Sequence, residues 1–161
     1  MLDSTYNSLC NNNESVETSK YKENHKDYKL TLRKKNLNEN CKEITEISDA
    51  YSDVLSFNLS YNNLTYLPDN LLSLKNLISL DIRKNTFKDI NQIIEFISKY
   101  KYLTDLKIDF SSSSQVQTLL SKNQNLLYIN GKSTENYINP IDINKNIVDL
   151  ISIEKKLPAI Y

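Results

Sequence analysis

One spacing of apolar residues and asparagines recurs through the middle of the chain. The pattern apolar-x-x-apolar-x-apolar-x-x-Asn-x-apolar runs through residues 54–64 and 77–87, and its first half returns at residues 103–108. A repeat of this kind constrains the fold strongly, because one strand with its return segment cannot bury its apolar side alone. We therefore expect the copies to stack on one another.

The same frame extends in both directions. Leu30 and Leu32 begin an upstream copy, in which Lys35 replaces the asparagine, and Leu126 and Ile129 begin a downstream copy. The first strand residues of the copies stand at positions 30, 57, 80, 106 and 129, so the steps are 27, 23, 26 and 23 residues. These steps are typical of leucine-rich repeats. The pattern predicts an α/β solenoid, a short arc of about five parallel strands on the concave face with helical or 3₁₀ returns.

The return segments are expected to differ from one another. Residues 67–77 contain Pro68, which is excluded from helix interiors, so an extended or 3₁₀-like return is expected there. Residues 90–100 and 115–122 have apolar residues at helical spacing. The serines at 111–114 replace an apolar position of the frame, so the fourth turn is expected to be irregular.

Three residues are predicted to have structural roles. Asn62 and Asn85 stand where the chain leaves a strand, and a buried amide there can bond backbone groups that the turn leaves unpaired. Ser111 takes the same position in the fourth copy. Gly131 is the only glycine of the chain, and we expect it to allow a positive-φ bend or close packing where the stack ends.

The chain divides into three parts. Residues 1–26 are polar, without apolar periodicity, and are expected to be a disordered tail. Residues 27–135 hold the repeats, and residues 136–161 are expected to form a C-terminal cap segment. Apolar spacing there predicts an amphipathic helix over about residues 143–156. This cap helix would cover the end of the stack, or alternatively dock into a partner.

Composition narrows the class of partner. The net charge is zero, which argues against overall attraction to nucleic acid or to a membrane surface. No secretory leader and no membrane-spanning stretch is recognisable. Cys10 and Cys41 are the only cysteines, and we expect reduced thiols in an intracellular protein of the cytoplasm or nucleus. The chain is expected to be monomeric on its own.

No catalytic, cofactor or metal site is predicted. His25 is the only histidine and stands in the polar tail, which argues against triads and histidine metal sites. Asp105 and Asp109 flank one strand, but on an open sheet face we expect recognition rather than acid–base chemistry. Residues 131–134 resemble the end of a phosphate-binding loop, yet Leu126 stands where its first glycine is required.

The register also predicts which side chains share the concave face, because the residues between buried strand positions point outward. Three columns result: Thr31, Asn58, Asp81, Lys107 and Asn130; Arg33, Ser60, Arg83, Asp109 and Lys132; and Lys34, Tyr61, Lys84, Phe110 and Ser133. The predicted protein-binding residues are Asn58, Tyr61, Asp81, Arg83, Lys84, Asp105, Lys107, Asp109 and Phe110. Tyr61 and Phe110 are the expected anchors, since aromatic side chains often dominate interface energetics.

Residues 125–131, Asn-Leu-Leu-Tyr-Ile-Asn-Gly, resemble the C-terminal cap of intracellular leucine-rich repeat proteins. That group includes phosphatase-1 regulators, the A′ protein of the U2 spliceosomal particle, axonemal dynein light chain and acidic nuclear phosphoproteins. The resemblance covers about residues 30–135 and identifies the superfamily. It implies a non-enzymatic scaffold, adaptor or regulatory subunit, with a phosphatase catalytic subunit as one partner. A ribonucleoprotein component and a cytoskeletal adaptor are the alternatives.

Overall fold

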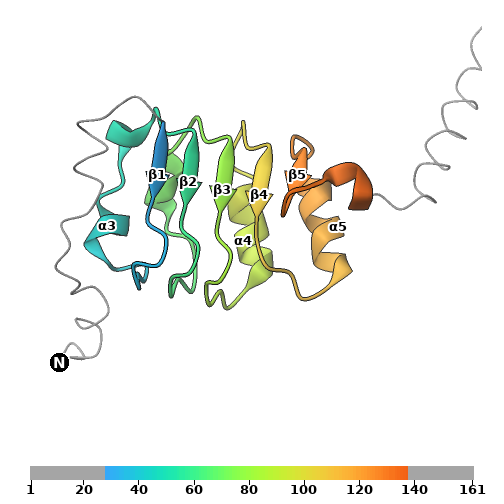
Figure 1. Ribbon diagram of the computed structural model, residues 1–161, viewed down its shortest axis with the longest axis horizontal. Helices are drawn as coiled ribbons and strands as arrows, with labels where there is room; N and C mark the ends of the chain where they lie inside the picture. Colours follow the sequence, from blue (N-terminus) through green and yellow to red (C-terminus); the bar gives the residue numbers. More distant parts are fainter. Residues whose placement is uncertain (1–27, 138–161) are drawn as a thin grey trace, which may run out of the picture.

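The computed structural model describes residues 28–137, which form one mixed sheet with its strands in sequence order (Figure 1). The strands are β1 (Lys29–Thr31), β2 (Ser56–Asn58), β3 (Ser79–Asp81), β4 (Asp105–Lys107), β5 (Tyr128–Ile129) and β6 (Lys132–Ser133). Neighbouring strands from β1 to β5 are parallel, and β6 is antiparallel to β5. The chain thus has a small α/β fold. The predicted polar tail and cap helix lie outside the described residues.

Short helices connect the strands. They are α3 (Lys42–Thr45), η1 (Asp49–Tyr51), η2 (Asp69–Ser73), α4 (Ile90–Ile97) and α5 (Ser113–Lys122), and η3 (Thr134–Tyr137) follows β6. The return after Pro68 is 3₁₀, as its proline predicts. Helix α4 begins after Asp89, whose side chain accepts hydrogen bonds from the backbone of Asn91 and Gln92. Helices α4 and α5 pack against each other.

The register brings equivalent residues of the repeats side by side. Leu30 pairs with Phe57, Phe57 with Leu80, Leu80 with Leu106, and Leu106 with Ile129. All five side chains are buried, and they belong to one apolar cluster that runs through every repeat. The core therefore has no break at which the described residues would divide into two units.

Cys41 departs from the sequence-based expectation. It precedes α3, is buried, and is disulfide-bonded in the structure, so the expectation of a reduced thiol is wrong for this residue. Cys10, the only other cysteine of the chain, lies outside the described residues. Sequence spacing cannot predict such a bond, because it requires two Cβ atoms to approach in space. Separately, no helix within residues 28–137 has the length and apolarity needed to cross a bilayer.

Candidate protein-binding face

Asn62 holds together the turns that leave β1 and β2. Its Oδ1 accepts hydrogen bonds from the backbone nitrogens of Lys35 and Leu37, both at 3.1 Å. Its Nδ2 donates to the carbonyl oxygens of Leu32 at 2.8 Å and Leu59 at 2.9 Å. The amide is buried, so one side chain hydrogen-bonds four backbone groups of the two turns.

Asn85 repeats this arrangement one strand later. Its Oδ1 accepts from the backbone nitrogen of Leu64 at 3.1 Å. Its Nδ2 donates to the carbonyl oxygens of Leu59 at 3.1 Å and Ile82 at 3.0 Å. The two asparagines therefore form a ladder across the first three repeats, and they fix how each chain segment leaves the sheet.

The same turns place three large side chains in left-handed backbone. Lys34, Tyr61 and Lys84 occupy equivalent positions and have φ values of 55°, 59° and 57°. Residues other than glycine rarely adopt this conformation, because Cβ crowds the backbone there. Phe110, the fourth member of this predicted column, does not share the left-handed conformation. The first three repeats are thus alike at this position, and the fourth differs.

Tyr61, one of the two expected anchors, is exposed and lies beside cations. Its side chain is 42% exposed. The guanidinium carbon of Arg33 lies 4.8 Å from the ring centroid and the ammonium of Lys34 lies 5.3 Å from it. Such contacts are attractive because the ring face carries negative charge density. The tyrosine therefore presents its ring together with two positive charges from the neighbouring repeat.

Asp81 and Arg83 bind each other on β3 and the turn after it. The Nη2 atom of Arg83 lies 2.8 Å from Oδ2 of Asp81, and Nε lies 3.0 Å from Oδ1. This hydrogen bonding raises the pKa of Arg83, with burial opposing the rise. The Asp81 side chain is only 12% exposed, against 40% for Arg83. The Asp81 carboxylate is therefore largely occupied by its bonds to Arg83, and the Arg83 side chain is the more accessible of the two.

The fourth strand carries the remaining predicted charges. The Ser79 hydroxyl lies 3.4 Å from Oδ2 of Asp105, whose Oδ1 is buried without a hydrogen-bond partner among the described residues. Lys107 is half-buried in β4. Asp109 is exposed, and its Oδ2 accepts a hydrogen bond of 2.6 Å from the backbone nitrogen of Lys84. The Asp109 carboxylate therefore also holds the turn in shape.

Two expectations for the columns are wrong. Ser60 was expected to face outward, but it is fully buried, because its backbone nitrogen and hydroxyl both bond to Oδ1 of Asn58, at 3.0 and 2.7 Å. Asn58 itself is half-buried in β2. Lys132 and Ser133 were expected to continue the parallel columns, but they form the antiparallel strand β6. The outward columns therefore end at the fourth repeat.

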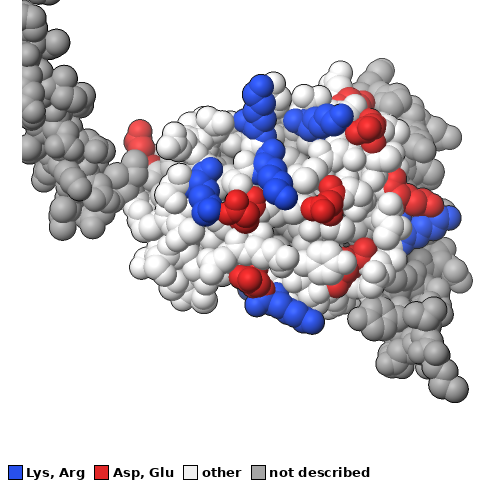
Figure 2. Space-filling view, turned by 180° about the vertical axis from the view of Figure 1, so that it is seen from behind, with Lys and Arg blue, Asp and Glu red and all other residues white. Residues whose placement is uncertain are grey.

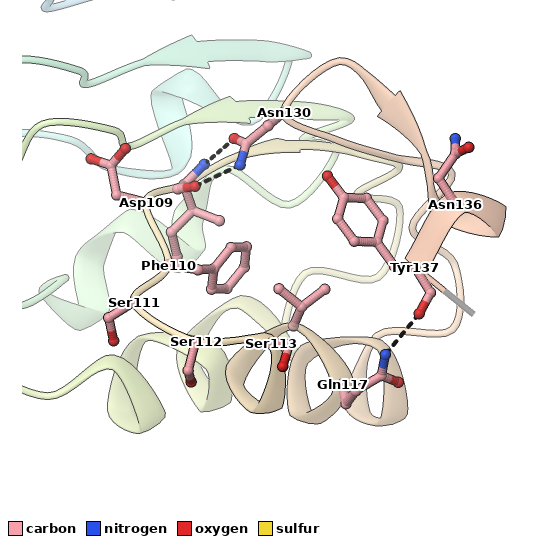
Figure 3. A pocket seen from close by; sticks show the side chains of 11 residues that line it. Asp109, Phe110, Ser111, Ser112, Ser113, Gln117, Asn130, Asn136 and Tyr137 are labelled. Carbon is pink, nitrogen blue, oxygen red and sulfur yellow. Dashed lines mark hydrogen bonds between the residues drawn. The ribbon is translucent and has the colours of Figure 1, made fainter. Parts of the chain in front are cut away.

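The turn after β4 is irregular, as its serines predict, and it is hollowed on both sides of Phe110. One hollow, of about 720 Å³, lies between this turn, α5 and η3, and Phe110 and Tyr137 line it (Figure 3). A second, of about 300 Å³, lies between Phe110 and Phe87. Phe110 is partly buried against the core. It therefore does not stand on the open strand face as the second expected anchor would.

The hairpin at the end of the sheet was not foreseen. Asn130 and Gly131 join β5 to β6, and their φ values are 52° and 78°. Two consecutive positive φ values identify a type I′ turn, for which Asn-Gly is the favoured dipeptide, so the sequence did contain the signal. The Asn130 side chain also bonds the backbone nitrogen and carbonyl of Ile108 at 2.9 and 2.8 Å (Figure 3).

Charges on the opposite side of the molecule are mixed. The face shown in Figure 2 carries acidic and basic side chains next to one another, without an area of one sign. Two exposed pairs in the described part of the chain are Lys75 with Asp49 at 3.4 Å and Lys122 with Glu95 at 2.6 Å. Within residues 28–137, no group of three His, Cys, Asp or Glu side chains converges as metal ligands would.

The outward side chains of β1 to β4, together with those of the turns that follow these strands, form a surface that we call the strand face. The structure brings Tyr61, Arg83, Lys84, Lys107 and Asp109 to this face, whereas Asp81 is mostly covered and Phe110 turns toward the hollows. No known protein family matches the chain, and no curated protein is detectably similar to it in sequence.

Proposed function

We propose that the chain is a leucine-rich repeat module that binds another protein through its strand face. The observation that carries the proposal is the exit turn that recurs after β1, β2 and β3. The asparagine ladder and the left-handed residue fix this turn to the same geometry in each repeat. The side chains of Lys34, Tyr61 and Lys84 are therefore held on a rigid frame, one strand apart.

The arrangement of the strands supports the repeat architecture. Each strand of three residues or fewer lies next to the strand of the preceding repeat, and the connecting segment returns to the start of the next one (Figure 1). Such short units bury their apolar side only against their neighbours. A curved solenoid with one open strand face is the form that this packing favours.

The chemistry of the strand face favours binding over catalysis. Its exposed groups are an aromatic ring, several cations and carboxylates that bond to neighbouring backbone or side chains. Arginine and tyrosine recur among residues that dominate protein interfaces, because they combine apolar area with directed donors. We therefore assign the chain the role of an adaptor or regulatory subunit.

Charge reversal tests the strand face. Arg83→Glu combined with Asp109→Lys should abolish recovery of the main partner in affinity purification followed by mass spectrometry. The matched control exchanges an exposed pair in the segments that precede β2 and β3, Lys75→Glu with Asp49→Lys, and should leave recovery unchanged. Circular dichroism melting identifies a variant that fails to fold. In that case Tyr61→Ala, which removes only the exposed ring, replaces the double variant. Unchanged recovery with a folded variant would place the interface elsewhere.

The identity of the recovered protein separates the three functional classes. A phosphatase catalytic subunit would establish a regulatory subunit, spliceosomal proteins a ribonucleoprotein component, and dynein or tubulin a cytoskeletal adaptor. We favour the first class. The charge balance of the chain gives no support to independent RNA binding, so RNA in a complex would be expected to enter with another subunit.

The intracellular location stays a prediction, and Cys41 offers a direct test of it. Disulfides persist in oxidising compartments and are rare in the cytosol. Cells can be quenched in acid and denatured, and their thiols alkylated before reduction. A cytosolic or nuclear protein should then carry label at Cys41. Absence of label would show that the disulfide of the structure also exists in the cell and would contradict the intracellular location.

A further inference from the structure

Positive charge gathers on one part of the strand face although the chain as a whole is neutral. The outward positions of the first three repeats carry five cations and one carboxylate: Lys29, Arg33, Lys34, Arg83, Lys84 and Asp81. The fourth repeat instead carries Asp105 and Asp109 on either side of Lys107. The face is therefore positive over β1 to β3 and mixed at β4.

Of these five cations, only Arg83 forms a salt bridge with a carboxylate among residues 28–137. Asp81 is bound by Arg83 through two hydrogen bonds, and the Asp109 carboxylate of the fourth repeat accepts a hydrogen bond from the backbone nitrogen of Lys84. Among residues 28–137, neither Lys34 nor Lys84 belongs to a salt bridge. Both side chains are exposed. Lys34 and Lys84, which form no salt bridge in this part of the chain, therefore belong to the repeats on either side of Tyr61, and the Lys34 ammonium lies 5.3 Å from the centroid of its ring.

The backbone at these three positions is a second, independent observation. A left-handed conformation costs a residue with a Cβ about 1–2 kcal/mol, and glycine would avoid that cost. The chain nevertheless has Lys34, Tyr61 and Lys84 there in three consecutive repeats. An unfavourable conformation that recurs with long, exposed side chains points to a role for those side chains.

We propose that this part of the strand face binds an extended acidic segment of a protein partner, with its carboxylates against Arg33, Lys34 and Lys84. The inference rests on the proposed function and specifies the chemistry of the partner. Carboxylates complement fixed cations at this spacing, and an extended chain can run across adjacent strands while its side chains meet successive repeats.

A nucleic acid fits the same surface less well. Single strands are bound by cations together with aromatic faces on which bases stack. The Tyr61 ring already has Arg33 and Lys34 against it, at 4.8 and 5.3 Å. Asp105 and Asp109 on the next strand would also repel phosphates that continued along the face. A protein segment with a short acidic stretch avoids both difficulties.

The test measures binding of a defined probe to the full chain by fluorescence anisotropy. The probe is a fluorescein-labelled peptide of alternating Glu and Ser, and its matched controls replace Glu by Gln or by Lys. We expect saturable binding of the Glu peptide alone, weakening as salt increases. Absence of saturable binding, or equal binding of the Gln peptide, would overturn the proposal. So would tighter binding of a labelled oligothymidine, which would indicate a nucleic-acid surface.

Two double variants separate a local site from overall charge. Lys34→Glu with Lys84→Glu should weaken binding of the Glu peptide about tenfold or more. Lys75→Glu with Lys101→Glu makes the same change in net charge at positions that precede strands, and should change binding by no more than about twofold. Equal losses in both would overturn the local site. The two proposals can also fail separately. If reversal of Arg83 and Asp109 abolishes recovery of the partner but the acidic peptide does not bind, the proposed function is supported and only the acidic-segment inference is rejected.

Discussion

The exit turn after β3 accepts a hydrogen bond from the preceding turn with a backbone carbonyl, whereas the exit turn after β4 accepts the equivalent bond with a side chain. After β2, the backbone nitrogen of Tyr61 donates to the backbone carbonyl of Arg83 at 2.9 Å. After β3, the equivalent nitrogen of Lys84 donates instead to the side chain of Asp109, which stands in the exit turn after β4. In the turn after β4, Ser111 stands in place of the asparagine and bonds Gln115 within its own repeat.

This difference shows how a repeat stack can end. Where one backbone bonds the next, the outward side chains are free to vary, because none of them is required for the turn. Where side chains supply the bonds, the turn depends on particular residues and no longer fits closely to its neighbour. The hollows beside Phe110 lie in that part of the molecule. The regular repeats are therefore the part to which we assign the proposed recognition, and we consider the fourth repeat a transition to the end of the sheet.

The strongest test of this contrast removes an asparagine of the ladder. Asn62→Ala removes hydrogen bonds to two backbone nitrogens and two carbonyls, and of these four groups the Leu59 carbonyl keeps its bond from Asn85. We expect a loss of about 3 kcal/mol in the free energy of unfolding, since buried unpaired groups are costly. Ser111→Ala at the equivalent exposed position should cost less than about 0.5 kcal/mol. Urea unfolding followed by circular dichroism measures both. Equal losses would show that the two turns are held in the same way.

Two tyrosine hydroxyls provide a second test, one in the regular part and one at the end. Tyr100 is buried and donates to the carbonyl of Leu71 at 3.0 Å, whereas Tyr137 donates to Ile129 at 3.2 Å at the edge of a hollow. Tyr100→Phe should cost about 1.5 kcal/mol, because it removes a buried hydrogen bond and leaves the Leu71 carbonyl with only its bond from the backbone nitrogen of Leu74. Tyr137→Phe should cost less.

The Tyr100→Phe variant should also differ from wild type in alkaline solution. Burial raises the pKa of Tyr100 above its ordinary value of 10.0. The folded state therefore retains this proton where the unfolded state loses it, so stability falls as pH rises above about 10. Tyr100→Phe should therefore reduce the slope of that decline relative to wild type. Denaturant midpoints at a series of pH values give the slopes. Identical slopes in wild type and Tyr100→Phe would contradict the expectation.

Gly131 tests the hairpin that ends the sheet. An added Cβ would meet no atom within 4 Å, so Gly131→Ala probes the backbone alone, at a φ of 78°. We expect a loss of about 1 kcal/mol from the left-handed conformation. Thermal unfolding measures it, and Gly131→Asn, which tolerates positive φ, should recover part of the loss. If Gly131→Ala left the free energy of unfolding unchanged, the type I′ turn would not be maintained in solution.

The smallest effect is expected at a left-handed position of the regular repeats. Lys84→Gly should stabilise the fold by about 0.5 kcal/mol, because relief of the backbone exceeds the added entropy of the unfolded chain. Lys107→Gly in β4, where φ is not positive, should destabilise it instead. The same Lys84→Gly variant should bind the acidic peptide more weakly. If Lys84→Gly increased stability without weakening peptide binding, the left-handed backbone would have no connection with the proposed binding site.

Part of the fold could be read from spacing alone. The paired strand residues, the 3₁₀ return after Pro68 and helix α4 all follow from apolar periodicity and from proline, which act locally. The hydrogen bonds of a second set of asparagines could not be predicted from spacing. Asn76 bonds the carbonyl of Ser52 at 2.8 Å and Asn125 that of Lys101 at 3.2 Å, each to the preceding return segment. Their roles are invisible until the repeats are stacked.

The site was less predictable than the fold. Alternation in a strand indicates which residues point outward, but it does not show which of them bond to one another. Asp81 is covered by Arg83, and Ser60 is buried beneath Asn58, because turns redirect side chains once the strand ends. Tyr61 is as exposed as expected, yet the cations beside it come from the neighbouring repeat.

The sequence by itself determined the repeat, its register and the apolar core, since each depends on residues at fixed separations along the chain. The tertiary structure decided which charges remain unpaired, where the backbone is left-handed, and which side chains replace backbone carbonyls at the fourth turn. Those properties depend on neighbours that are about one repeat apart in sequence and meet only when the strands stack. The recognition chemistry that we propose for the strand face depends on this second group.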